Sequence, residues 1–408
     1  MERKKQTSEG SDLKYIDLFS GCGGLALGLH KAGWQGLFAV EKSPDAFSTI
    51  QHNLINKYSY FDWPSWLEQK NHDINHVIEQ HAKELENLRG QVTLIAGGPP
   101  CQGFSMAGRR REEDERNKLI DSYIEFVRLV QPKILFFENV KGFTIGFKSN
   151  NKRGEAYSKY VWTKLEELGY DVKGQIVDFS EFGVPQKRQR FILVGTKIGY
   201  AQDFFDRIVH NRADFLRSKG LQSDTVSLED ALSDLLAKHG KEISPDSKNF
   251  FAGKYAQPMS PYQKLMRQGK KLTGKIADSH RFPNHKEDTV ARFEEILVSE
   301  RRNKSVSDEI RTKYNLKKHT IVPLSKDEQA PTLTTLPDDY IHYEEPRILT
   351  VREYARIQSF PDDYEFKGKY TTGGDRRKID VPRYTQIGNA IPPLFAEQAG
   401  IILKGLHK

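Results

Sequence analysis

Cys101, one of only two cysteines in this chain of 408 residues, stands in a turn that would suit a nucleophile. Residues 92–96 form an apolar run that predicts a short buried strand, and the Gly-Gly-Pro-Pro sequence at 97–100 ends it. Cys101 is therefore expected on a stiff loop at the carboxyl edge of a sheet, where open α/β folds bind their ligands. Its thiol could attack a substrate atom, whereas the alternative interpretation is a small buried cysteine in a tight turn.

Glu138 and two arginines could supply the acid and the anion-binding groups for the same chemistry. Glu138 follows apolar residues 134–137, so it is expected near the carboxyl edge of the sheet with a raised pKa, as a proton donor. Arg188 and Arg190 lie on one face if their segment is extended, and their guanidiniums can hold a phosphate and a base carbonyl. The alternatives are a strand-end ion pair for Glu138 and a solvated basic start of a strand for the arginines.

These groups need a sheet to bring them together, and the first half of the chain predicts one. Residues 20–24 form a glycine turn between a strand and a helix, where backbone N–H groups can approach a ligand closely. Glu41 ends the next strand, where its carboxylate could accept hydrogen bonds from ribose hydroxyls. The alternative is a purely structural turn, which lacks the GxGxxG spacing of dinucleotide binders. The expected strands are 13–19, 35–40, 92–96, 134–137, 170–179 and 190–195, and the expected helices are 25–32, 118–130 and 160–169.

The alternation of strands and helices predicts a doubly wound α/β domain over residues 13–196, after a flexible tail at 1–12. Between 197 and 343 the alternation fails, because the segment is polar, rich in turns and basic, with aromatic residues interleaved. We expect a second, smaller domain there. Residues 344–408 form a C-terminal segment whose last helix is expected to return to the first domain.

Composition limits the classes of partner and metal that the chain can use. Lys and Arg total 63 against 55 for Asp and Glu, a formal charge of +8, which suits a polyanionic partner. Two cysteines exclude a disulfide framework and a four-cysteine zinc site, so no metal is expected and the thiols fit a reducing compartment. The N-terminus is polar and the apolar runs are shorter than a membrane span, so we expect a cytoplasmic protein without a membrane partner.

Taken together and in this order, the segments resemble the DNA (cytosine-5) methyltransferases, whose ordered motif set is highly specific. The resemblance extends over residues 16–393, nearly the whole chain. Its motifs are the cofactor turn at 17–24, the proline-cysteine motif at 97–105, Glu-Asn-Val at 138–140, Gln-x-Arg-x-Arg at 186–190, the segment 347–361 and Gly-Asn at 388–389. The resemblance implies a Rossmann-like fold of the S-adenosylmethionine-dependent methyltransferase type, with the second domain as a target-recognition domain.

The resemblance also implies S-adenosylmethionine as the cofactor and methyl donor. Glu41 would bind the ribose, Asp73 the adenine amine, and Asn389 would lie near the methionine part. Lys42 departs from the family, which often has an aromatic residue after the ribose-binding glutamate, so adenine must pack elsewhere, against Ile74 and Phe19. The full set of expected cofactor residues is Asp17, Phe19, Gly21, Gly23, Gly24, Glu41, Asp73, Ile74, Pro99, Leu119 and Asn389.

For catalysis, the resemblance implies that the Cys101 thiolate adds to C6 of cytosine, while Glu138 protonates N3 and Arg190 lies near the C2 carbonyl or the adjacent backbone. The base must first be flipped out of the duplex. The expected catalytic set is Cys101, Glu138, Arg188 and Arg190, and the expected DNA-binding residues are Gln102, Ser105 and Gln186. Residues 197–343 would read the target sequence.

The predicted function is methylation of C5 of a flipped-out cytosine within a specific short duplex DNA sequence, protecting DNA in a restriction-modification system. The expected partners are double-stranded DNA and a cognate restriction endonuclease that acts on the same site without a stable complex, and the protein is expected to be a monomer. Two alternatives stay open: a tRNA cytosine-5 methyltransferase, which shares the catalytic set, and a catalytically silent DNA-binding relative. A nicotinamide-dependent oxidoreductase would need the absent GxGxxG turn.

Overall fold

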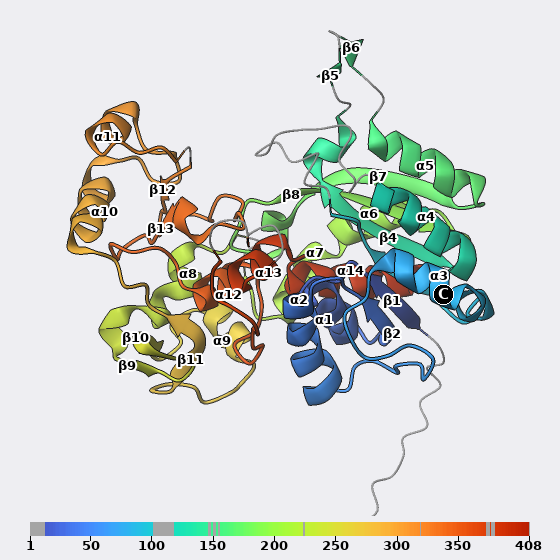
Figure 1. Ribbon diagram of the computed structural model, residues 1–408, viewed down its shortest axis with the longest axis horizontal. Coiled ribbons are helices and arrows are strands. Elements are labelled where there is room, and N and C mark those ends of the chain that lie inside the picture. Colours follow the sequence, from blue (N-terminus) through green and yellow to red (C-terminus); the bar gives the residue numbers. More distant parts are fainter. Residues whose placement is uncertain are drawn as a thin grey trace, which may run out of the picture.

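The computed structural model describes residues 13–100, 118–145, 148–149, 152–153, 156–222, 225–318, 320–372, 376 and 380–407. Three predicted site residues, Cys101, Gln102 and Ser105, lie outside the described residues, as does the predicted tail at 1–12. The described chain forms two lobes, one built on a large sheet and the other on a small sheet with helices around it (Figure 1).

A six-stranded mixed sheet forms the centre of the first lobe (Figure 1). Its strand order is β2 (Gln35–Val40), β1 (Lys14–Leu18), β3 (Leu94–Gly97), β4 (Ile134–Val140), β8 (Gln189–Thr196) and β7 (Asp171–Asp178). The first four strands are parallel, whereas β8 runs antiparallel to both β4 and β7. A short connection that includes the 3-10 turn η4 (Phe179–Phe182) joins β7 to β8, and such a connection suits an antiparallel pair. The predicted α/β fold is confirmed, with an antiparallel pair at one edge.

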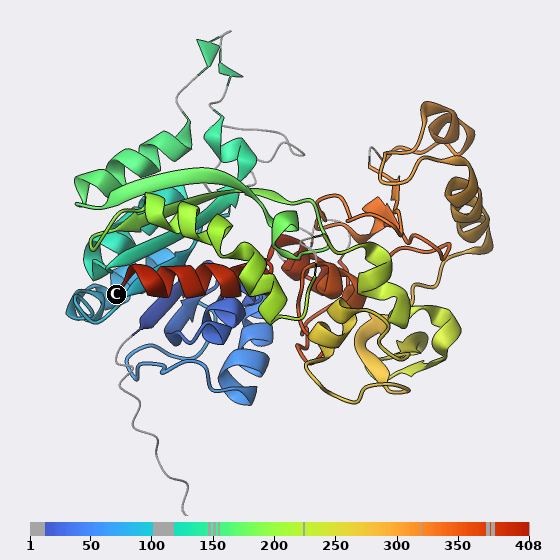
Figure 2. The same ribbon diagram turned by 180° about the vertical axis from the view of Figure 1, so that it is seen from behind.

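Strand residues alternate between two apolar clusters, one on each face of the sheet. On β4, Ile134 and Phe136 belong to one cluster, and Leu135 and Phe137 belong to the other. The first face is covered by α1 (Gly24–Lys31), α6 (Gln202–His210) and α14 (Pro393–Leu406), and the second by α3 (Ile74–Asn87), α4 (Lys118–Val130) and α5 (Tyr157–Glu167) (Figure 2). The sheet is therefore buried on both faces, and its ligand-binding edge is where the strands end.

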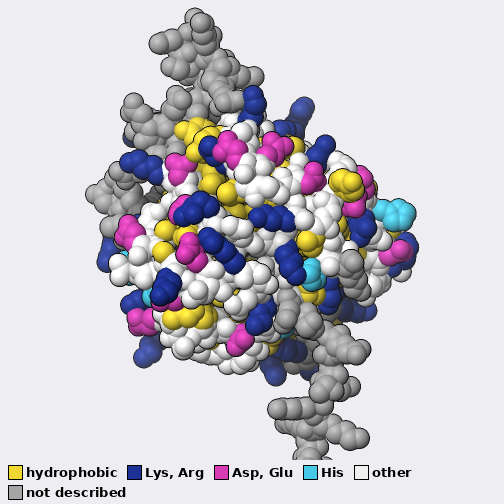
Figure 3. Space-filling model, turned by 90° about the vertical axis from the view of Figure 1, so that its right-hand side faces the viewer, with side chains coloured by type: hydrophobic (Ala, Val, Ile, Leu, Met, Phe, Trp, Pro, Cys, Tyr) yellow, Lys and Arg dark blue, Asp and Glu magenta, His cyan; other side chains and the backbone are white. Residues whose placement is uncertain are grey.

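The end of the first lobe that faces away from the second lobe carries a mixed surface. Lys and Arg side chains are interspersed there with Asp and Glu side chains (Figure 3). Such mixing of charges is typical of a solvent-exposed surface. The positive net charge of the chain is therefore not gathered on this face.

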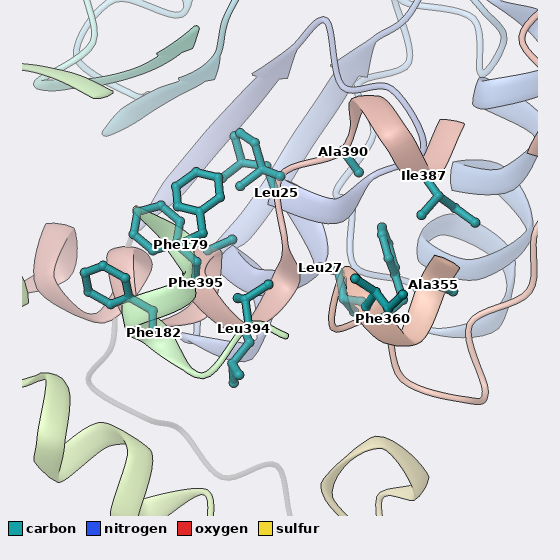
Figure 4. Packing of buried hydrophobic residues seen from close by; sticks show 14 of the residues in the cluster. Leu25, Leu27, Phe179, Phe182, Ala355, Phe360, Ile387, Ala390, Leu394 and Phe395 are labelled. Carbon is teal, nitrogen blue, oxygen red and sulfur yellow. The ribbon is translucent and has the colours of Figure 1, made fainter. Parts of the chain in front are cut away.

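The last helix, α14, packs on α1 near the start of the chain. Gly28 permits the close approach, because a Cβ there would lie 2.3 Å from the Cβ of Ala396. At the start of α14, Phe395 stacks on Phe179 with ring centroids 4.2 Å apart (Figure 4). The two ends of the described chain thus share one core.

Helices α6 and α7 (Arg212–Ser218) belong to the first lobe, although the sequence predicts the start of the second domain at residue 197. Phe204 of α6 contacts Phe136 of the sheet with ring centroids 6.0 Å apart. The Gln398 amide of α14 donates to the carbonyl oxygen of Ile208. The polar composition of the whole segment hides this apolar helical face. In the structure the second lobe begins after α7.

The second lobe contains a three-stranded antiparallel sheet in the order β11 (Ile276–Arg281), β10 (Ser247–Lys254) and β9 (Lys241–Ser244). Helix α12 (Val351–Ile357), from the predicted C-terminal segment, lies in this lobe. Its buried Arg356 forms ion pairs with Asp234 and Asp362, and its buried Arg352 pairs with Asp278 of β11. Buried ion pairs therefore fix α12 to the second lobe.

Helices α10 (Glu287–Ser299) and α11 (Asp308–Lys313) project from the second lobe around a small apolar core that includes Phe293, Ile296 and Ile310 (Figure 1). The other described elements are α2 (Pro44–Ile50), η1 (Gln51–Lys57), η3 (Lys141–Thr144), β5 (Lys148–Ser149), β6 (Lys152–Arg153), α8 (Leu228–Leu232), η5 (Ser233–Leu235), η6 (Ala237–His239), α9 (Pro261–Arg267), β12 (Val322–Pro323), η7 (Pro337–Asp339), β13 (Tyr340–Ile341) and α13 (Arg383–Asn389). Within the described ranges, no helix is long and apolar enough to cross a membrane.

Candidate active site

The turn that precedes Cys101 passes between the ends of two strands with no room for side chains. Gly97 has a φ of 112°, and a Cβ there would lie 1.9 Å from the carbonyl oxygen of Leu18 at the end of β1. A Cβ on Gly98 would lie 1.9 Å from the carbonyl oxygen of Glu138 in β4. The Asn139 amide also donates to the carbonyl oxygen of Pro99 over 3.3 Å. The chain leading to Cys101 is therefore fixed directly to the strand that carries Glu138.

Glu138 and Arg190 form an ion pair beside this turn, with 3.0 Å between Oε1 and Nε. The two side chains are only 16 % and 13 % exposed. Burial raises the pKa of Glu138 above its ordinary value, while the positive charges of Arg190 and Arg188 act in the opposite direction. A carboxyl group in this setting can stay protonated and donate a hydrogen bond, and the arginine beside it orients the group.

The structure places Gln186 and Arg188 inside the protein. Gln186 is fully buried, where its amide donates to the side-chain oxygen of Gln358 and its own oxygen accepts from the backbone N–H of Leu333. Arg188 is 1 % exposed and donates to the carbonyl oxygens of Leu333 and Gly388. The hydrogen bonds of both side chains thus go to other parts of the protein, while Arg188 Nε is buried without a partner within the described residues. This placement differs from the predicted contact of Gln186 with DNA, because a buried amide with these partners does not face the duplex.

The predicted cofactor turn follows β1 and opens onto free space. Gly21 has a φ of 55°, which favours glycine, and a Cβ there would meet no atom within 4 Å. Its backbone N–H donates to Glu41 Oε2 over 2.9 Å, and the N–H of Ser43 donates to Glu41 Oε1 over 2.7 Å. Burial raises the pKa of Glu41 to about 7. Glu41 therefore holds the turn in place and can still change its charge near neutral pH.

The next two glycines bring α1 close to the C-terminal part of the chain. A Cβ on Gly23, whose φ is 83°, would lie 2.7 Å from a methyl carbon of Leu54. A Cβ on Gly24 would lie 2.3 Å from the carbonyl oxygen of Ile391. Only glycine allows this packing, so the turn is fixed against the segment that follows Asn389. Phe19, at the start of the turn, has a φ of 55°, which is uncommon for a residue with a side chain.

Asp17 is the strongest structural indication that a ligand belongs at this turn. Its side chain is fully buried, and neither carboxylate oxygen has a hydrogen-bond partner within the described residues. Burial, and then the charge of Glu41, raise its pKa well above the ordinary value. Buried polar groups are normally hydrogen-bonded. The residues present therefore fit S-adenosylmethionine, whose amino group and sulfonium centre carry positive charge and whose ribose carries hydroxyl donors.

The residues predicted around adenine lie at the ends of β2 and the start of α3. Asp73 caps α3 by accepting from the N–H of Asn75, and its other oxygen forms an ion pair with Lys42 over 2.9 Å. Ile74 is buried in the apolar cluster on which Phe19 and Leu119 also pack. Lys42 thus pairs with the Asp73 carboxylate predicted to bind the adenine amine. Apolar side chains lie next to Asp73. Asn389, at the end of α13, is exposed.

Two side chains that lie in predicted motifs but outside the predicted set of site residues also shape the site. Asn139 fixes the turn before Cys101 through its hydrogen bond to Pro99, and its place in the Glu-Asn-Val motif is the signal that points to it. The Gln358 amide donates to the carbonyl oxygen of Ile387, which lies 29 residues away. No local pattern indicates such a contact, because it depends on how the two helices pack.

Comparison with known proteins places these features in a family. A family model described as C-5 cytosine-specific DNA methylase matches residues 13–403. Type II methyltransferase M.DdeI of Desulfomicrobium norvegicum is 31% identical, with 94% of this chain and 87% of that protein covered. Type II methyltransferase M1.HphI of Haemophilus parahaemolyticus is 30% identical, with 94% and 85% covered.

Solved structures share the fold. A candidate DNA modification methyltransferase encoded within an E. coli prophage superposes with a TM-score of 0.67 at 23% identity, covering 97% of this chain and 99% of that chain. The S. pombe Dnmt2 methyltransferase gives a TM-score of 0.53 at 15% identity, covering 97% and 98%. The family model spans almost the whole chain, and the relatives align over most of their own length. The chain therefore belongs to the C-5 cytosine-specific DNA methylase family.

Proposed function

We propose that this DNA methyltransferase transfers a methyl group to C5 of a cytosine that is flipped out of a specific short duplex DNA sequence, with Cys101 as the nucleophile. One observation carries the proposal: the turn that leads to Cys101 touches Glu138, and Glu138 is paired with Arg190. This contact supports the proposal, because the residues that lead to Cys101 end next to a partly buried acid. The type II relatives support a role in a restriction-modification system.

Cys101 supplies the covalent step. C5 of cytosine is a poor nucleophile, and addition of the thiolate sulfur to C6 turns C5 into the carbon of an enamine, which can attack an electrophilic methyl group. After methylation, C5 loses its proton and the bond between the cysteine sulfur and C6 breaks, which restores the aromatic ring and the thiolate. The covalent intermediate is formed between Cys101 and the base.

Glu138 and Arg190 stabilise the charge that this addition creates. Electron density from the thiolate would accumulate at N3 of the ring, so a protonated Glu138 donates a hydrogen bond and then a proton to N3, and N3 returns this proton when the cysteine sulfur leaves C6. The raised pKa of Glu138 supports this role, because burial favours the neutral carboxyl group that can donate the proton. Arg190 holds the carboxyl through the ion pair and can donate its remaining N–H groups to the C2 carbonyl oxygen.

The residues around the glycine turn would hold S-adenosylmethionine, which supplies an electrophilic methyl group when bound. Glu41 can accept from ribose hydroxyls, and the buried carboxylate of Asp17 can balance positive charge. Ile74 and Phe19 offer apolar surface next to Asp73 for the adenine. We propose the other members of the set on the same grounds, namely Gly21, Gly23, Gly24, Pro99, Leu119 and Asn389.

DNA would enter between the two lobes, where the strand ends face the second lobe (Figure 1). Flipping the base costs roughly a few kcal/mol of unstacking, and contacts from the protein must offset this cost. We propose Gln102 and Ser105 for such contacts and the second lobe for reading the target sequence. The proposed setting is a cytoplasmic monomer that meets a cognate restriction endonuclease on the same DNA site without a stable complex.

Bisulfite sequencing of DNA from cells that express the protein tests the activity and identifies the target. We expect protected cytosines in one short sequence, and none in cells that express Cys101→Ala. Duplexes with 5-fluorocytosine at the target should trap a covalent adduct with the wild-type protein, because fluorine cannot leave as a proton does. An unmodified genome together with methylated tRNA would replace the proposal with an RNA methyltransferase, and turnover by Cys101→Ala would refute the assigned nucleophile.

A further inference from the structure

The end of helix α13, next to Asn389, is held by an unusual set of side chains. The last carbonyl groups of a helix have no partner within the helix. Here buried side chains donate to three of them in succession. The Cys22 thiol lies 3.4 Å from the oxygen of Gln386, the Gln358 amide 2.9 Å from the oxygen of Ile387, and Arg188 Nη2 2.9 Å from the oxygen of Gly388. Three buried side chains therefore hold the last turn of α13, which leads to Asn389.

Arg188 contributes the contact nearest to Asn389 and bridges it to a second segment. Its Nη1 donates to the carbonyl oxygen of Leu333 over 3.3 Å. Gly388 lies directly against that segment, since a Cβ there would be 2.5 Å from the carbonyl oxygen of Thr334. Arg188 thus connects the end of α13 to the segment at Leu333 and Thr334. Glycine at position 388 permits this close contact.

The charge of Arg188 has no carboxylate in direct contact within the described residues. Its guanidinium donates to backbone carbonyl oxygens. Burial and the charge of Arg190 lower the pKa of Arg188, while Glu138 and Tyr340 act in the opposite direction. Glu138 in turn feels two positive charges, from Arg190, which it touches, and from Arg188. Arg188 therefore places a positive charge inside the protein, close enough to act on Glu138, without an ion pair of its own.

We propose that Arg188 is a positioning residue, which fixes Asn389 against the cofactor turn and holds a positive charge behind the pair of Glu138 and Arg190 without touching the target base. The proposal rests on the function proposed above, because Asn389 and Glu138 take their roles from it. It separates the two arginines of one segment. Arg190 reaches the reacting group, whereas Arg188, at 1 % exposure, acts on its surroundings.

Two substitutions separate the two parts of this role. Arg188→Lys keeps the charge but cannot bridge two carbonyl oxygens, so we expect binding of S-adenosylhomocysteine to weaken by about tenfold, the effect of losing one charged hydrogen bond. Arg188→Gln loses the charge as well. In the pH profile of the methylation rate, the fall at alkaline pH should move upward by about half a pH unit in Arg188→Gln, because the pKa of Glu138 rises when a nearby positive charge is removed. Arg188→Lys should leave this part of the profile unchanged.

The measurements are calorimetric binding of S-adenosylhomocysteine, single-turnover methylation of target duplex across pH, and adduct formation with 5-fluorocytosine DNA, with Arg190→Lys as the matched variant. We expect Arg190→Lys to lose adduct formation and to bind S-adenosylhomocysteine as the wild type does. The reverse pattern is expected for Arg188→Lys.

Two results would overturn the inference. One is wild-type binding of S-adenosylhomocysteine in both Arg188 variants with loss of the adduct, since Arg188 would then touch the base. The other is an unchanged affinity and an unchanged pH profile in both. A wild-type protein that neither binds S-adenosylhomocysteine nor methylates DNA would contradict the proposed function instead, so the two failures are distinguishable.

Discussion

Replacing Gly98 with alanine should separate the nucleophile from the acid. A Cβ at this position would lie 1.9 Å from the carbonyl oxygen of Glu138, and real Cβ contacts do not fall below 3.0 Å, so the two chains must part by at least 1.1 Å. The movement cannot be absorbed in the preceding strand, because β3 is paired on both sides, with β1 and β4. It therefore falls on the turn at Pro99 and on Glu138.

The magnitude follows from the geometry that catalysis needs. A displacement of about 1 Å in a reacting group can cost roughly 10²-fold in rate. We therefore expect kcat/KM of Gly98→Ala to fall by about 10²-fold. Overpacking of this kind typically costs about 1–3 kcal/mol in the free energy of unfolding, so the variant should still fold.

Single-turnover methylation of a target duplex measures the effect, with urea unfolding to follow stability. Gly199→Ala is the matched control, because neither glycine requires a positive φ and a Cβ on Gly199 would meet nothing within 4 Å. The control should methylate at the wild-type rate. A Gly98→Ala variant that folds and methylates as fast as the control would show that contact between the turn and Glu138 does not set their spacing for catalysis.

Three further outcomes are expected. Affinity for S-adenosylhomocysteine should rise as pH increases through about 7, because Glu41 accepts from ribose hydroxyls as a carboxylate, and calorimetry of Glu41→Gln should show no such dependence. Lys42→Trp should tighten this binding several-fold, since an aromatic ring stacked on adenine contributes about 0.5–1.5 kcal/mol and the lost surface ion pair is worth little; unchanged calorimetric affinity would place adenine elsewhere. Exchange of residues 222–343 for those of a relative, with Asp234 retained for its buried ion pairs, should change the methylated sequence in bisulfite sequencing, and an unaltered target would refute recognition by the second lobe.

Local patterns predicted the fold because the sheet is built from apolar runs that end in turns. The expected strand at 134–137 is part of β4, but the strand continues to Val140, so Glu138 lies within it. The reason is the pairing with β8, which extends to Val140 and Arg190. Backbone hydrogen bonds between strands do not require apolar side chains, and a prediction from hydropathy ends too early there.

The parts of the site that escaped prediction depend on contacts between distant segments. Lys42 pairs with Asp73 across 31 positions, and neither residue carries a local sign of the other. Arg188 reads as an exposed basic residue because charged side chains are seldom buried, yet it is enclosed by the ends of segments that come later in the chain. Side-chain burial is a property of the assembled fold. Residue type alone therefore indicates what chemistry a side chain can do, but not whether the side chain points into the protein or to the solvent.

The segment from Gln186 to Arg190 shows how spacing alone can set such directions. Alternate residues of an extended chain point to the same side, at intervals of about 6.6 Å. Gln186 bonds to Gln358, Arg188 to the end of α13, and Arg190 to Glu138. The spacing of Arg188 and Arg190 therefore sets the distance between the end of α13, next to Asn389, and Glu138. A single inserted residue would turn this side of the segment over for part of its length. The spacing of glutamine and arginines in the motif thus has a structural role. It positions Asn389, the proposed cofactor residue, relative to Glu138, the proposed proton donor.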